Sequence, residues 1–196
     1  SPYLPSAAVV ERVTKLTEKE RLFTVTPAID INGQPVKFNP GQFFMAGLPG
    51  YGEAPFSVAS MPVTSHVNGS IKRSFDLCIR AAGNLSNAMH RVKKGDRIWL
   101  RGPFGRGFTP EELKGKDLLF IAGGIGIVPM RSLIKSVVGL EGFGKMTLVC
   151  GAKTPEEILF QGEMDEWKAA GMDVRLTIDK PSKGWIILPC MPEFYY

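Results

Sequence analysis

The chain has 196 residues, of which 44% are hydrophobic, enough to bury a core in one large domain or two small ones. Its 22 glycines and 15 prolines indicate many turns and exclude a helical bundle, and the dispersed basic residues behind its net charge of +5 do not form a nucleic-acid surface. No run reaches the roughly 18 apolar residues of a membrane helix, and the three separated cysteines predict a protein of the reducing cytoplasm without disulfides.

The first half of the chain alternates polar and apolar residues over short stretches, as antiparallel strands buried on one face do. One short helix is expected at residues 85–92, with Asn84 as its cap. These elements predict a small, closed, six-stranded antiparallel barrel. The six expected strands span residues 8–14, 21–26, 42–46, 55–60, 75–80 and 97–102.

The pattern changes near Phe108, after which strands and helices alternate. This βαβαβ order predicts a parallel sheet with right-handed crossovers. We therefore expect a barrel domain at residues 1–112 and an α/β domain at residues 113–196. The α/β elements are strands at 118–122, 145–150 and 173–178 and helices at 128–138 and 157–170.

A glycine cluster follows the apolar run at 118–122. Gly123, Gly124 and Gly126 allow a tight turn, and Pro129 fits the first turn of the helix that follows. Such a turn presents free N–H groups to a diphosphate or another anion. The cluster lacks the GxGxxG spacing of the dinucleotide fingerprint, so taken alone it fits a plain strand–helix turn equally well.

Five motifs follow one another along the chain, at residues 40–43, 55–60, 83–86, 102–105 and 123–129. In this order they resemble the motifs of the ferredoxin–NADP reductase superfamily, which joins a flavin-binding barrel to a nucleotide-binding α/β domain. The sequence segments GEAPFS, GPFGRGF and GAKTPEEILF most resemble those of the gamma subunits of NAD(P)-linked hydrogenases and sulfhydrogenases. The corresponding subunit of anaerobic sulfite reductase and the electron-transfer subunit of dihydroorotate dehydrogenase are further relatives. The motifs are Pro40-Gly41-Gln42-Phe43, Pro55 to Ser60, Gly83-Asn84-Leu85-Ser86, Gly102-Pro103-Phe104-Gly105, and Gly123 to Gly126 with Pro129.

The resemblance implies that the barrel binds FAD. Phe56 would stack on the flavin ring, although an aromatic residue of the barrel core fits the same position. The family's arginine is replaced by Ala54, and Arg80 is the candidate substitute for the diphosphate; an ordinary surface arginine is the equal alternative. The implied FAD-binding residues are Pro55, Phe56, Ser57, Arg80, Gly83, Asn84, Leu85 and Ser86.

The resemblance also implies that the second domain binds NAD(P). Asp179 would repel a 2′-phosphate and accept from a ribose hydroxyl, which favours NAD, whereas Lys180 weakens that preference. The implied residues are Gly123, Gly124, Gly126, Pro129, Gly151, Ala152 and Asp179.

The implied function is a flavoprotein oxidoreductase subunit that carries electrons between NAD(P)H and an iron–sulfur partner through FAD. Its partners would be hydrogenase or reductase subunits of a complex, with no nucleic acid and no membrane insertion. The family's later strands and 2Fe-2S cysteines have no match after Trp185, so the second domain is expected to be shortened, with the cluster on a missing segment or a partner. This shortening leaves open a docking or regulatory subunit that keeps the fold without turnover.

Overall fold

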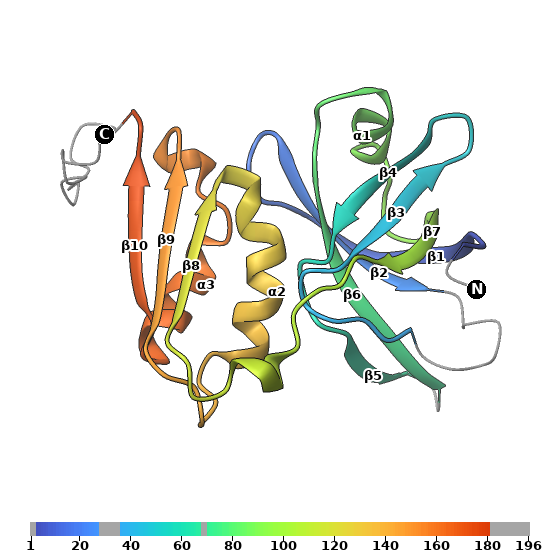
Figure 1. The fold of residues 1–196 in the computed structure, drawn as a ribbon. Helices are drawn as coiled ribbons and strands as arrows, with labels where there is room; N and C mark the ends of the chain where they lie inside the picture. Colours follow the sequence, from blue (N-terminus) through green and yellow to red (C-terminus); the bar gives the residue numbers. More distant parts are fainter. Residues whose placement is uncertain (1–2, 28–35, 68–69, 181–196) are drawn as a thin grey trace. The chain divides into compact units, whose positions relative to one another are not determined.

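The computed structural model describes residues 3–27, 36–67 and 70–180, with side chains described in these ranges except at 65–72. The chain divides into two compact units (Figure 1). The first comprises Ser1–Thr109 together with Val128–Ser136, and the second comprises Pro110–Ile127 and Val137–Tyr196. Each unit is described by itself below.

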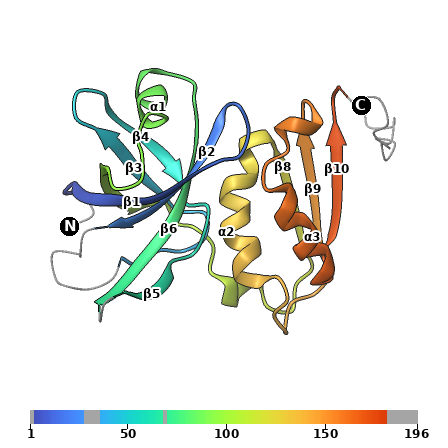
Figure 2. The same cartoon turned by 180° about the vertical axis from the view of Figure 1, so that it is seen from behind.

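The first unit is built on an antiparallel sheet of seven strands in the order β4-β3-β7-β1-β2-β6-β5. The predicted antiparallel architecture is confirmed, with one strand more than expected. The extra strand is β5, which lies at the end of the sheet order and pairs with β6 (Figure 2). The strands are β1 (Ser6–Lys15), β2 (Glu20–Pro27), β3 (Phe43–Leu48), β4 (Gly52–Ser57), β5 (Val63–Val67), β6 (Ser70–Arg80) and β7 (Arg97–Phe104).

The other six strands close into a ring just past the end of β4. Val58 forms an isolated antiparallel bridge with Leu77 of β6. The adjoining backbone bonds run from Val58 N to Gln42 O (3.0 Å) and from Ala59 N to Asp76 O (2.8 Å). The bridge brings the end of β4, with its Pro55–Ser60 motif, beside the second half of β6, which leads toward the motif at Gly83–Ser86.

Alternate residues of the strands fill the interior of this ring, as the two-residue period of a strand requires. Phe44 and Phe75 stack with ring centroids 4.9 Å apart, and Phe38 meets Phe75 edge-on at the same distance. The short helix α1 (Asn84–Met89) adds Leu85 and Met89 to this core. Burial of these two side chains therefore fixes α1 against the barrel.

The second unit contains a parallel sheet in the order β10-β9-β8, as the βαβαβ pattern predicted. Its strands are β8 (Leu118–Gly123), β9 (Met146–Ala152) and β10 (Asp173–Ile178). Helix α3 (Gln161–Ala169) buries Met164 and Trp167. It begins later than expected because Pro155–Glu157 forms a 3₁₀ turn and the extended backbone of Ile158 interrupts the helix.

Helix α2 (Ile127–Val137) begins directly after a 3₁₀ turn at Gly124–Gly126. Its residues 128–136 group with the first unit, whereas the turn before it belongs to the second. A further 3₁₀ turn occupies Pro110–Leu113. None of the helices in the described ranges is long and apolar enough to cross a membrane.

Candidate functional site

The end of β4 carries the first predicted flavin residues. Phe56 lies opposite Phe44 in register, packs against the barrel core and stays partly exposed. Its neighbour Pro55 is exposed, and Ser57 is half-buried. Phe56 therefore belongs in part to the barrel core, one of the two roles considered from the sequence, and its contact with a flavin stays a prediction.

The residues just before this motif do not supply a cation. Ala54 lies opposite the fully buried Ala46 and packs against the core. Glu53 accepts a hydrogen bond from Arg101 Nε (3.0 Å), and this bond lowers the pKa of the Glu53 carboxyl. Arg101 is therefore already engaged, and an anion near Ser57 would need its positive charge from elsewhere.

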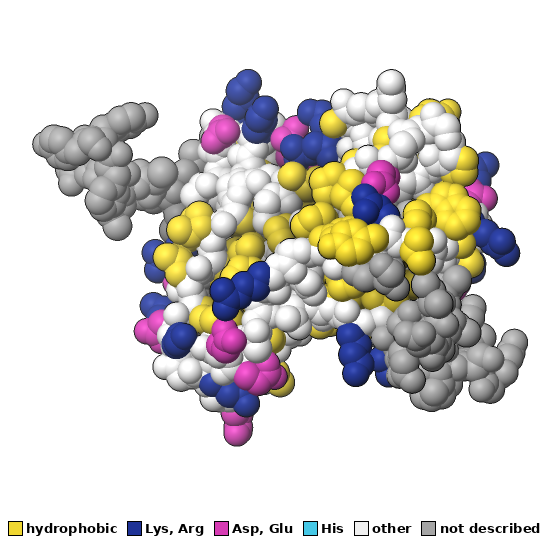
Figure 3. Space-filling view, turned by 45° about the vertical axis from the view of Figure 1, so that its right-hand side comes forward, with side chains coloured by type: hydrophobic (Ala, Val, Ile, Leu, Met, Phe, Trp, Pro, Cys, Tyr) yellow, Lys and Arg dark blue, Asp and Glu magenta, His cyan; other side chains and the backbone are white. Residues whose placement is uncertain are grey.

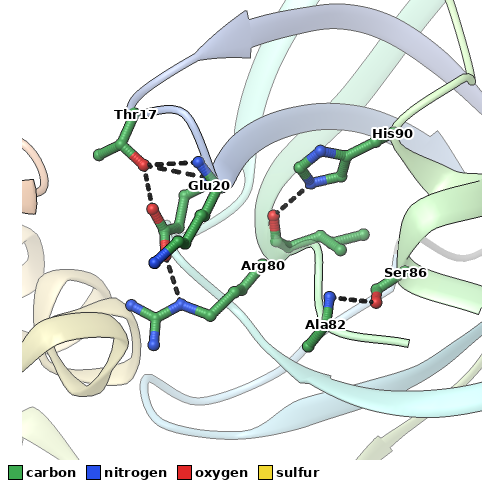
Figure 4. A network of polar contacts seen from close by, with 8 residues as sticks. Thr17, Glu20, Arg80, Ala82, Ser86 and His90 are labelled. Carbon is green, nitrogen blue, oxygen red and sulfur yellow. Dashed lines mark hydrogen bonds and ion pairs between the residues drawn. The ribbon is translucent and has the colours of Figure 1, made fainter.

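Arg80, at the end of β6, is held in place by a buried carboxylate. Its Nε donates to Glu20 of β2, a residue only 2% exposed, which also accepts a hydrogen bond from the hydroxyl of Thr17 (Figure 4). In the described part of the chain, the Nη groups of Arg80 make no recorded hydrogen bond. Glu20 thus orients Arg80 and leaves its outer donors available to an anion.

The turn into α1 is ordered by Ser86. Its hydroxyl oxygen accepts from the backbone N–H groups of Ala82 and Gly83, both at 2.9 Å, and its hydroxyl donates to Gly83 O at 3.1 Å (Figure 4). Asn84 at the helix start is exposed. The first N–H groups of a helix have no acceptor inside it, so this turn presents donors outward.

Gly83 is not explained by the protein alone. Its φ of −152° is an extended conformation that any residue adopts, and a Cβ built there would meet no atom within 4 Å. Neither the backbone nor the packing requires glycine at this position. The open space in front of Gly83 is the kind that a closely approaching ligand would use.

Helix α1 is also fixed at its other end. Arg21 of β2 donates to the carbonyl of His90, and His90 Nε2 donates to Ile79 O at 2.8 Å. Ala81 N donates to Lys19 O, also at 2.8 Å. His90 is a half-buried link between α1 and β6. These bonds hold the turn at residues 81–86 in place.

In the second unit, predicted nucleotide residues meet at the carboxyl edge of the sheet. Gly123 ends β8 and Ala152 ends β9, while Asp179 directly follows β10 and donates its N–H to Ala152 O at 3.1 Å. Asp179 is exposed. Ligands of open α/β sheets bind outside this edge, so the arrangement suits a nucleotide.

Glycine occupies the positions near this edge for different structural reasons. Gly124 has a φ of +51°, which favours glycine. A Cβ at Gly151 would lie 3.0 Å from Thr177 Oγ1, so packing explains this residue, which belongs to β9 rather than to the loop expected from the sequence. At Gly123 and Gly126 a Cβ would meet nothing within 4 Å, and neither has a positive φ. Gly123 and Gly126 therefore leave room for a ligand.

Two further motifs support one another rather than forming a ligand site. Gln42 Nε2 donates to Gly105 O at 2.6 Å, and a Cβ at Gly41 would lie 2.8 Å from the ring of Phe108. Gly41 N also donates to Ser132 Oγ of α2 at 3.0 Å. Ser132 and its neighbour Arg131 were not predicted as contact residues. A charged residue within the apolar pattern of α2 is the sequence signal that could have indicated them.

Comparisons with known proteins relate this chain to NAD-binding oxidoreductases. Residues 120–187 match the family model described as the oxidoreductase NAD-binding domain. Sulfhydrogenase 1 subunit gamma of Pyrococcus furiosus is 36% identical over 169 residues, which cover 86% of this chain and 56% of the relative. The electron-transfer subunit of a probable dihydroorotate dehydrogenase B from the same organism is 34% identical over 149 residues, 76% of this chain and 51% of the relative.

The chain is a homologue of these electron-transfer subunits. The resemblance to hydrogenase gamma subunits is thereby confirmed. The chain spans about half the length of the curated relatives that it matches. All seven predicted NAD(P) positions lie within the NAD-binding oxidoreductase span, 120–187, while the role of each residue stays a prediction.

Solved structures show that this homologue has the ferredoxin-reductase fold. The cytochrome b5 reductase domain of Ulva prolifera nitrate reductase has a TM-score of 0.74 at 18% identity, over 95% of this chain and 78% of that one. The ferredoxin reductase in carbazole 1,9a-dioxygenase has a TM-score of 0.73 at 20% identity, over 93% and 53%. At these identities the likeness establishes the fold alone.

Proposed function

We propose that this chain is a flavoprotein reductase subunit that binds FAD on its barrel and takes electrons from NAD(P)H for an iron–sulfur partner. Bound FAD would supply the redox chemistry, accepting a hydride and releasing single electrons. The chain itself therefore needs no nucleophile or general acid. Its task is to bind, to orient and to provide compensating charge.

The flavin half of the proposal is supported by the contacts around α1. The Nη groups of Arg80 and the N–H groups at the start of α1 would face the diphosphate, with Arg80 replacing the cation that Ala54 lacks. The exposed part of Phe56 offers a surface for the ring, and the Ser57 hydroxyl offers a hydrogen bond to a ring nitrogen. Pro55, Asn84 and Leu85 would complete this site.

The nucleotide half is supported by the carboxyl edge of the second sheet. Gly123 and Gly126 would admit a diphosphate close to the backbone, at the turn that leads into Pro129. Asp179 would accept from a ribose hydroxyl and repel a 2′-phosphate, which favours NADH over NADPH. Lys180 follows it directly and weakens this preference.

One observation carries the proposal. Gly83, Gly123 and Gly126 all have backbone angles that do not demand glycine, and all face open space. They occur at the two turns where a flavin reductase needs room for phosphate groups. A protein without ligands at these turns would gain by substituting any of them, because glycine loses more conformational entropy on folding.

The proposed binding of an iron–sulfur partner is supported by one further relative and by the surface of the first unit. One relative is the ferredoxin–NAD(+) reductase component of the alkene monooxygenase system of Xanthobacter autotrophicus, 30% identical over 165 residues. The first unit exposes Tyr3, Tyr51 and Trp99, and hydrophobic side chains gather on its surface (Figure 3). Arg91 lies 5.8 Å from the ring of Tyr51. Exposed aromatic residues with arginine are typical of protein interfaces.

Anaerobic titration of the FAD-reconstituted chain tests the proposal. We expect a bound-flavin absorption band that NADH bleaches, and that NADPH bleaches at higher concentration. A chain that binds no FAD, or whose bound flavin neither nicotinamide reduces, contradicts it. Bound flavin without reduction, together with stable binding to a partner subunit, would instead support the docking alternative.

A further inference from the structure

Arg131 of α2 forms a buried ion pair that the function above does not use. The residue is 3% exposed, and its Nη1 lies 3.2 Å from Asp76 Oδ2 and donates to Ala59 O at 2.6 Å. Asp76 accepts a further hydrogen bond from Thr24 Oγ1 at 2.7 Å. The guanidinium therefore joins α2 to β6 and to the segment after β4, all within the first unit.

The next residue of α2 makes a second link. Ser132 is fully buried; its Oγ accepts from Gly41 N at 3.0 Å and donates to Pro129 O at 2.8 Å. We call Arg131 and Ser132 together the α2 anchor. It holds the first turns of α2 at three points of the barrel: Ala59, Asp76 and Gly41.

Stability alone is a weak reason for such a pair. Desolvating two charges offsets most of their attraction, and apolar replacements of a buried ion pair are often as stable. What an ion pair adds is a defined geometry, and the location of this one is informative. Ala59 comes two residues after Ser57, and Asp76 comes four residues before Arg80. The α2 anchor therefore contacts both chain segments that carry the proposed flavin site.

The same end of the helix joins the proposed nucleotide turn. Helix α2 begins at Ile127, immediately after Gly126, so the chain passes from the turn into the anchored helix without a linker. A helix fastened to the flavin strands restricts where that turn can lie. Hydride transfer demands such restriction, because donor and acceptor react only at roughly 3–3.5 Å.

We propose that Arg131 and Ser132 are positioning residues for reduction of the flavin by NADH. The proposal rests on the function proposed above. Neither side chain would touch the flavin or the nicotinamide; both act by holding α2. Loss of the anchor should therefore slow hydride transfer while leaving each binding step largely intact.

Rapid-mixing kinetics on the FAD-reconstituted chain test this. In Arg131→Met we expect the limiting rate of flavin reduction at saturating NADH to fall on the order of 10- to 100-fold. The dissociation constants of FAD and NADH should change by less than about threefold. Arg131→Lys, which keeps a charge for Asp76, should recover part of the rate. The matched control is Arg175→Met, which removes the exposed partner of Asp173 in β10.

The possible outcomes separate the two proposals. If the wild-type chain is not reduced by NADH, the proposed function fails and this inference fails with it. If the wild type is reduced and Arg131→Met keeps both its flavin and its rate, only this inference is overturned. The same holds if the variant merely melts earlier or loses flavin while its remaining flavin is reduced at the wild-type rate. Should Arg131→Met not fold, Ser132→Ala decides, since it removes the link to Gly41, together with the bond to Pro129 O within α2, and keeps the ion pair.

Discussion

Arg80 donates through Nε to the buried carboxylate of Glu20, at the point where β6 ends and the chain turns toward α1. A buried carboxylate thus fixes the stem of an arginine whose outer face is open. This pairing separates two functions that one residue could not combine. Glu20 orients Arg80 from the protein side, and in the function proposed above the Nη groups of Arg80 would bind the diphosphate.

The first prediction concerns this pair. In the double variant Glu20→Gln/Arg80→Met both charges are lost, so no buried charge is left unpaired. We expect its FAD dissociation constant to rise about 10- to 100-fold, because a charge-assisted hydrogen bond contributes about 1.5–3 kcal/mol. Equilibrium flavin titration measures the effect. Glu20→Gln alone, which keeps Arg80, is the control, and equal FAD affinity in both variants would show that Arg80 does not bind the cofactor.

The second prediction concerns the space in front of Gly83. Threonine is a good N-cap residue and suits the extended backbone, so Gly83→Thr should fold at least as stably as the wild type. Its side chain would enter the open space and weaken FAD binding about tenfold or more. Thermal melts of the apo chain test the predicted stability, and flavin titration tests the predicted loss of FAD affinity. Gly162→Thr, at an equally open glycine of α3, should leave FAD binding unchanged. Wild-type affinity in Gly83→Thr would sink the prediction.

The third prediction separates the two ligands. Gly123 has φ −120° and ψ 126°, a conformation that valine favours. We expect Gly123→Val to fold and to bind FAD normally, but to need about tenfold or more NADH for half-maximal flavin reduction, since the valine side chain would occupy the open space. Stopped-flow reduction measured against NADH concentration reports this. A variant with an unchanged NADH dependence would rule out Gly123 as part of the nucleotide site.

The fourth prediction concerns Cys78 in the barrel core. Burial, and then the nearby Glu20 carboxylate, raise the pKa of its thiol from 9.0 to about 12. The thiol therefore ionises first in the unfolded chain, and the free energy of unfolding should fall as pH rises from about 9 toward 12. The slope is at most about 1.4 kcal/mol per pH unit. Urea unfolding at pH 8 and pH 10 measures it. Cys78→Ala should lack this component, and identical slopes in the two proteins would contradict the assignment.

The parts of this molecule that sequence reasoning predicted are those governed by local pattern. Alternation in stretches such as Leu22 to Thr26 and Phe75 to Arg80 identified barrel strands, because one face of each is buried. Strand β5 was missed because its exposed Val63 and polar neighbours give little alternation. The turns at Gly83 and Gly123 were predicted because glycine next to a helix start is a local signal.

What the sequence did not reveal depends on residues far apart in the chain. The packing reason for Gly151 lies in Thr177 on the neighbouring strand. Arg131 finds its acceptor in Asp76, and Arg80 finds its own in Glu20, across separations of 55 and 60 residues. No periodicity encodes such pairs. They emerge only when β2 pairs with β6 and when Arg131 of α2 reaches Asp76 of β6.

The closure of that ring has a consequence of its own. Every other neighbouring pair of barrel strands shares a ladder of several residues, whereas the ring is joined at Val58 and Leu77 by an isolated bridge. The seam therefore opens more readily than the rest of the barrel wall, and the cofactor we propose would lie across it. Binding of flavin would then hold this junction closed and make the holoprotein more stable than the empty barrel. Folding of the barrel would thereby depend on the supply of the cofactor.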